Sequence, residues 1–104
     1  MSLDEFRERY ARHVGHVVSG DMKAAIAEMV PENIPAVFEG VDVPREAVDG
    51  HRIVDVRAEG DKMVGETVYQ TKKGPIGLRS IWESRDGEWL AADLENFAPE
   101  DTDE

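Results

Sequence analysis

His13 is the first residue whose type and position suggest chemistry. It lies at the edge of the apolar face of a predicted helix, and Tyr10 lies one turn earlier on the same side. A histidine facing an apolar cavity can donate a hydrogen bond or exchange a proton near neutral pH. His13 is therefore a candidate catalytic residue. The alternative is a partly buried structural histidine with a backbone partner.

Two aspartates, Asp55 and Asp93, interrupt otherwise apolar strand patterns. A buried charge without a partner is costly, so each needs an explanation. One is catalysis, in which functional carboxylates show raised pKa values or tight arginine pairing. The other is a buried or edge salt bridge, for which the available cations are Arg52, Arg57 and Arg79.

Aromatic side chains supply the candidate ligand-binding residues, Tyr10, Tyr69 and Trp82. Flat rings can stack on a flat ligand. Trp82 and Tyr69, like Trp89, are equally suited to a hydrophobic core or a dimer interface.

No metal or cofactor is expected. The three histidines, His13, His16 and His51, contain no i, i+4 pair, and the chain has no cysteine. The glycine-containing segment 72–77, "KKGPIG", lacks the spacing of a nucleotide-binding loop and is typical of a hairpin turn.

Two helices must position His13. Ser2 and Glu5 form a predicted capping box that opens the first helix, which Gly20 ends. Asp21 can cap a second helix, which Pro31 stops. The apolar stripes comprise Leu3, Phe6, Tyr10, Val14 and Val17 in the first helix, and Met22, Ala25, Ile26 and Met29 in the second. The segment "PENIPAVFEG" predicts a short helical turn or an irregular link.

From about Val48 onward the pattern changes to four strands rich in β-branched and aromatic residues, separated by "EGD", "KKGP" and "RDG". Asp86-Gly87 predicts a tight hairpin that pairs Arg85 with Glu88. Three short connections imply an antiparallel meander. The fold class is therefore α+β, with N-terminal helices packed on a curved antiparallel sheet of about four strands.

Both faces of this sheet are predicted to be partly apolar. With a two-residue final turn, one face carries Leu78, Trp82, Trp89 and Phe97, and the other carries Ile81, Leu90, Ala92 and Leu94. A sheet covered on one side alone would show cleaner alternation. The helices can cover one face, so the sequence predicts a homodimer that covers part of the other.

The 104 residues fit one domain, predicted over 1–98, with an acidic and frayed tail over 99–104. The net charge of −11 disfavours nucleic acid and anionic membranes, because both bind through phosphates. The N-terminus has no apolar signal-peptide core, and no run reaches the ~20 apolar residues of a membrane span. We expect a soluble cytoplasmic protein.

The order of elements resembles the nuclear transport factor 2-like superfamily, a cone-shaped, cystatin-like α+β roll. The residues that carry the resemblance are Gly20-Asp21, the packing alanines Ala24, Ala25 and Ala27, and the hairpin from Trp82 to Trp89. It covers about Leu3 to Phe97. The chain is short for this superfamily and lacks the helix usually inserted after the first strand.

The resemblance implies a pocket between helices and sheet, and many members are homodimers. His13 matches the first-helix tyrosine of ketosteroid isomerase. That enzyme's carboxylate base falls near Glu39, and its second oxyanion donor falls near Ser80, where no acid stands. The isomerase mechanism is therefore not implied. Limonene-epoxide hydrolase uses an Asp-Arg-Asp grouping, which Asp55, Arg79 and Asp93 would supply.

Scytalone dehydratase uses histidines and an aspartate on this fold, which here would be His13, His51 and Asp55. Three functions follow as expectations. The first is a small-molecule-binding protein with an apolar ligand and no assigned specificity. The second is a SnoaL-like lyase, isomerase or cyclase that uses His13 and a strand aspartate. The third is a protein-interaction module.

Overall fold

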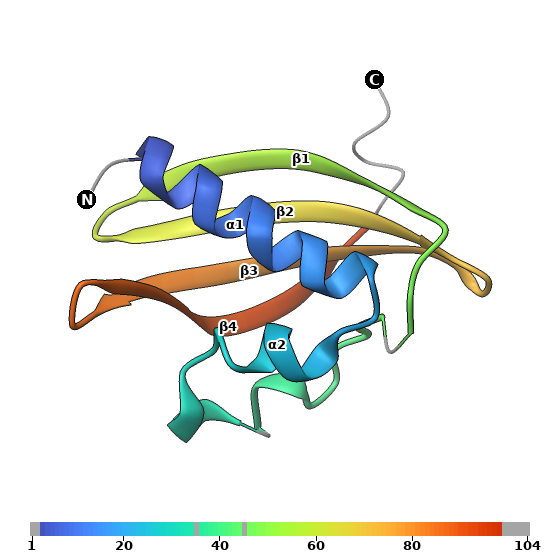
Figure 1. Ribbon diagram of the computed structural model, residues 1–104, viewed down its shortest axis with the longest axis horizontal. Helices are drawn as coiled ribbons and strands as arrows, with labels where there is room; N and C mark the ends of the chain where they lie inside the picture. Colours follow the sequence, from blue (N-terminus) through green and yellow to red (C-terminus); the bar gives the residue numbers. More distant parts are fainter. Residues whose placement is uncertain (1–2, 35, 45, 99–104) are drawn as a thin grey trace.

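The computed structural model describes residues 3–34, 36–44 and 46–98, and these form two layers (Figure 1). Helix α1 (Leu3–Val18) lies across one face of an antiparallel sheet with the order β1-β2-β3-β4. The strands are β1 (Gly50–Glu59), β2 (Lys62–Thr71), β3 (Gly74–Arg85) and β4 (Glu88–Phe97). The predicted α+β class and the four-stranded meander are confirmed. Ser2 of the predicted capping box and the predicted acidic tail lie outside the described residues.

The segment between α1 and β1 is long, and part of it lies beside β4. It contains α2 (Met22–Ile26) and two 3₁₀ turns, η1 (Pro31–Asn33) and η2 (Ala36–Phe38). The two turns agree with the first of the two predicted alternatives, a short helical turn or an irregular link. Within the described part of the chain, no helix is long and apolar enough to cross a membrane.

The joint between α1 and α2 is as tight as the sequence predicts. Gly20 has φ +81°, and two backbone bonds close the helix end: Gly20 N to Val17 O at 3.1 Å and Asp21 N to His16 O at 2.9 Å. This is a Schellman motif, which requires a left-handed residue after the helix. The Asp21 carboxylate then accepts from Ala24 N at 3.2 Å and caps α2.

The second helix ends at Ile26, before Met29 of its predicted apolar stripe and before the predicted stop at Pro31. The chain leaves the helix because its backbone pairs with the edge of β4. Val30 N donates to Ala91 O at 2.8 Å, and Ala91 N donates to Glu28 O at 3.0 Å. The pairing covers part of a sheet edge that would otherwise expose backbone donors and acceptors. It also fixes Glu28 beside α1.

The final hairpin confirms the predicted turn, because Asp86 (φ 54°) and Gly87 (φ 82°) both have positive φ and Arg85 pairs with Glu88. The predicted faces of β4 are partly wrong. The register shifts between Ile81 and Trp82, so Ala92 is an extra residue that reverses the alternation beyond it.

The consequence is that two side chains exchange faces. Leu94 packs in the core, whereas Phe97 lies on the other face, 5.5 Å beneath the Arg79 guanidinium. We call the face away from α1 the outer sheet face.

The core lies between α1 and the sheet. Phe6 of α1 packs against Tyr10, Trp82 and Trp89 with ring centroids 5.6–5.8 Å apart. Gly65 of β2 allows close approach here, since a Cβ at that position would lie 2.4 Å from the Tyr10 ring.

Candidate functional site

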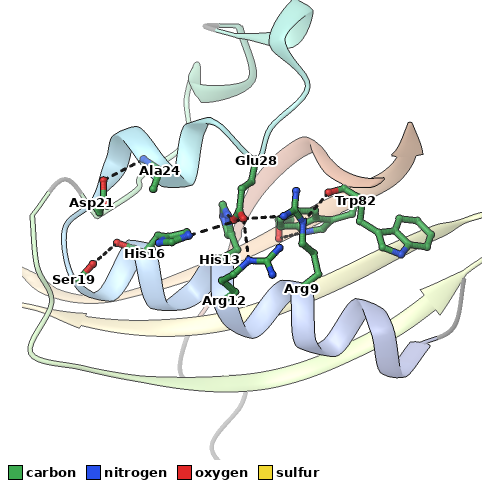
Figure 2. Close-up of polar contacts among 11 residues, drawn as sticks. Arg9, Arg12, His13, His16, Ser19, Asp21, Ala24, Glu28 and Trp82 are labelled. Carbon is green, nitrogen blue, oxygen red and sulfur yellow. Dashed lines mark hydrogen bonds and ion pairs between the residues drawn. The ribbon is translucent and has the colours of Figure 1, made fainter. Parts of the chain in front are cut away.

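Glu28 gathers four basic side chains from one face of α1 (Figure 2). Its carboxylate oxygens lie 2.9 Å from Arg9 Nη1, 3.5 Å from Arg12 Nε, 3.0 Å from His13 Nδ1 and 3.9 Å from His16 Nε2. Spacings of three and four residues place these groups on one side of the helix. We call these five residues the Glu28 cluster.

The cluster holds Glu28 in its ionised form. Burial of this side chain, which is 10% exposed, raises its pKa. The hydrogen bond with His13 and the charge of Arg9 outweigh burial, so the pKa of Glu28 lies below its ordinary value of 4.5. Arg9 is fixed further, because its Nε donates to Trp89 O at 3.1 Å. The carboxylate is therefore a rigid charged acceptor at neutral pH.

His13 connects the Glu28 cluster to the apolar interior. Its side chain is 10% exposed, and its ring meets Trp82 edge-to-face with centroids 4.9 Å apart. Nδ1 is the ring nitrogen directed at Glu28. The sequence predicted the partly buried position, whereas the partner is a carboxylate rather than the backbone.

His13 also lines a small apolar hollow between α1, α2 and the sheet, which we call the His13 hollow. Its other lining residues are Val17, Met22, Ala25, Ile26, Met29, Phe38, Val43, Pro44, Leu78 and Leu94. The hollow is partly open and measures about 30 Å³, and the empty space including adjoining solvent is about 320 Å³. Among these lining residues, His13 is the one with a titratable side chain.

The two strand aspartates lie away from His13. Asp55 is on the outer sheet face, where its carboxylate meets Arg57 Nη1 at 2.9 Å and is about half exposed. This is the salt-bridge alternative raised by the sequence. Asp93 Oδ1 accepts from Leu94 N at 2.9 Å. Asp93 also lines a separate open depression of about 450 Å³ with Glu32 and Asn33. The structure does not bring the three candidate catalytic residues together.

The three candidate ligand-binding aromatics are core residues. Tyr10 and Tyr69 are each 2% exposed, and burial raises the pKa of both phenols. The Tyr10 hydroxyl bonds to Thr67 at 2.6 Å, and Trp82 Nε1 donates to Ser80 Oγ at 2.7 Å. None of the three lines the His13 hollow as described. Trp82 lies behind His13 and supports its ring.

The remaining candidates do not approach the hollow. His51 and Glu39 are exposed, and neither is a lining residue among those described. Arg79 lies on the outer sheet face, where it bonds to Glu66 at 2.6 Å and also pairs with Glu95. Among the described ion pairs, Arg79 meets neither Asp55 nor Asp93 directly. Arg57, which pairs with Asp55, also pairs with Glu66 at 3.2 Å. In the described residues, no group of three or more histidine, aspartate or glutamate side chains is placed to hold a metal ion.

Sequence reasoning missed Glu28, Arg9 and Arg12. A signal was present, because Glu28 interrupts the apolar run from Ala25 to Val30. The partners of Glu28 could not be assigned, because the sequence predicted a helix at this position. The backbone pairing with β4 that orients Glu28 was therefore not expected.

Comparison with known proteins adds no assignment. No protein-family model matches the sequence, and no curated protein matches it.

Proposed function

We propose that this protein binds a compact, mainly apolar molecule in the His13 hollow. The observation that carries the proposal is one oriented polar side chain, His13, in an otherwise apolar lining. Ligand sites typically combine apolar walls with a few placed polar groups. Glu28 and Trp82 both fix the His13 ring, which is the preorganisation that binding requires.

Binding requires the hollow to widen. Its volume of about 30 Å³ holds about one water molecule, whereas an apolar cavity of roughly 150 Å³ accepts benzene. We expect the irregular backbone after η2, which includes Val43 and Pro44, to be the wall that moves. This segment is held to β4 by hydrogen bonds between Asp42 and the Asn96 side-chain amide, and both bonds are exposed to solvent. Segments held mainly by exposed hydrogen bonds open at lower free energy than core strands.

A matched pair of variants tests the proposal. Val43 lines the hollow, whereas Val41, two residues earlier and also packed on the core, does not. Toluene and phenol are titrated into the wild type and both variants by ligand-observed NMR. Val43→Phe should fill the mouth and abolish binding, and Val41→Phe should retain it. Equal binding by both variants, or no binding by the wild type, would refute the proposal.

We further propose that this chain is related to the nuclear transport factor 2-like superfamily. The helix pair closed at Gly20-Asp21, the meander bent by two register shifts, and the hollow between the layers all support it. The closing hairpin from Trp82 to Trp89 is part of the same likeness. A detailed comparison of an experimental structure with members of that superfamily would test it.

A second candidate function is acid–base catalysis of the lyase or isomerase kind. The observation in its favour is the hydrogen bond between Glu28 and His13, because a carboxylate behind an imidazole orients it as a base. In this candidate mechanism Glu28 replaces the strand aspartate that was expected to act with His13. Deuterium uptake by cyclopentanone in D₂O measures the activity. His13→Phe should lower the rate to that of buffer, and no acceleration by the wild type would remove this candidate.

The predicted homodimer through the outer sheet face stays a prediction. Half-buried Ile81, Leu90 and Phe97 on that face support it. Two other apolar residues of this face, Val64 and Val68, need no partner subunit, because they are 2% and 3% exposed within a single chain. The aliphatic parts of long arginine side chains can cover apolar residues in this way.

A further inference from the structure

The hydrogen bond between His13 and Glu28 determines which part of the imidazole a ligand would meet. A carboxylate only accepts, so the 3.0 Å contact to Glu28 Oε1 requires a proton on His13 Nδ1. In a neutral imidazole the other nitrogen, Nε2, then carries a lone pair. His13 lines the hollow, and Nε2 is the ring nitrogen that Glu28 leaves unengaged.

The cations around Glu28 surround a single carboxylate. Arg9 and Arg12 contribute two positive charges around its one negative charge, and His16 Nε2 lies 3.9 Å from the same carboxylate.

The orientation of Glu28 is also fixed. Oε1 faces His13, whereas Oε2 accepts from Arg9 at 2.9 Å and from Arg12 at 3.5 Å. Both oxygens are engaged, so the carboxylate has no second arrangement that would free Nδ1 and keep these bonds.

We propose that His13 Nε2 acts as a hydrogen-bond acceptor in the hollow and that the ligand is a compact apolar molecule carrying a hydroxyl or N–H donor. This inference rests on the proposed binding function and narrows its ligand class. It differs from one of the two roles considered from the sequence, in which His13 donates a hydrogen bond. It also makes Glu28 a positioning residue, because Glu28 would affect the ligand only by orienting the His13 ring.

Phenol and fluorobenzene provide the test, since they differ chiefly in the hydroxyl donor. One hydrogen bond contributes about 0.5–1.5 kcal/mol net, so we expect the wild type to bind phenol roughly two- to tenfold more tightly. In Glu28→Gln the carboxamide oxygen stays with Arg9, and its NH₂ donates to Nδ1. The proton then moves to Nε2, and the preference for phenol should fall at least by half. Glu32→Gln changes a surface carboxylate outside the hollow and should leave the preference unchanged.

Histidine ¹⁵N spectra of the unliganded wild type at neutral to alkaline pH give a measurement that needs no ligand. Nδ1 of His13 should show the shift of a protonated nitrogen and Nε2 that of an unprotonated one. The reverse pattern would overturn the inference. Equal affinity for phenol and fluorobenzene would overturn it and leave the binding function standing. Binding of neither probe would refute the binding function and this inference with it.

Discussion

Replacing Glu28 with glutamine should destabilise the protein at neutral pH. The change keeps the shape of the side chain and removes the charge that Arg9 and His13 share, whose side chains are 17% and 10% exposed. Hydrogen bonds to charged groups contribute about 1.5–3 kcal/mol when buried, and exposed pairs such as that with Arg12 contribute little. Glutamine retains part of the bonding, so we expect a loss of about 1–3 kcal/mol, or roughly 5–20 °C in Tm for a domain of this size.

The loss should depend on pH with a defined sign. The pKa of Glu28 is depressed in the folded protein, so its contribution to stability is present above the ordinary value of 4.5 and disappears as pH falls through the lower folded value. Glutamine has no such titration. Urea unfolding of both proteins between pH 7 and pH 3 should therefore show the wild-type advantage shrinking towards low pH.

A control variant measures how much stability changes when one exposed negative charge is lost. Glu32 is an exposed carboxylate paired with Arg85, and Glu32→Gln should leave unfolding close to that of the wild type at both pH values. An unfolding difference between wild type and Glu28→Gln that stays constant with pH, or that is absent at pH 7, would refute the electrostatic account of the Glu28 cluster.

Three further predictions concern the fold. Gly20→Ala should cost at least about 1 kcal/mol in thermal unfolding, because φ is +81° and the new Cβ would lie 2.7 Å from Ala47 N; unchanged stability would contradict the helix joint. Trp82→Phe should cost about 1–3 kcal/mol more than Trp89→Phe, since Trp82 Nε1 has an acceptor and the buried Trp89 Nε1 has none among the described residues. Equal losses in urea unfolding would argue against that difference. For the dimer, light scattering should give twice the chain mass of 11.6 kDa, and the mass of one chain would contradict it.

The turns were predictable because their chemistry is local. Gly20-Asp21 and Asp86-Gly87 specify positive φ and capping within a few residues, and the structure has both. The meander then follows from the short connections. His13 was recognised for a related reason, since helical spacing alone places it at the edge of an apolar face.

The rest depends on contacts that no local pattern encodes. The extra residue Ala92 reverses the faces of Leu94 and Phe97, and nothing in the strand pattern indicates a bulge at that position. The same bulged stretch pairs with Glu28–Val30, which shortens α2 and turns Glu28 towards α1. The bulge in β4 therefore explains both why the Glu28 cluster was not predicted and why the predicted faces of β4 were partly wrong.

Binding in the His13 hollow can be measured by phenol titration of methyl-labelled protein. We expect saturable shifts of methyl groups that line the hollow, those of Val17, Ile26 and Leu94, with Val64 and Val68 of the outer sheet face unchanged. Shifts confined to the outer face, or no saturable shift at any methyl group, would contradict binding in the hollow.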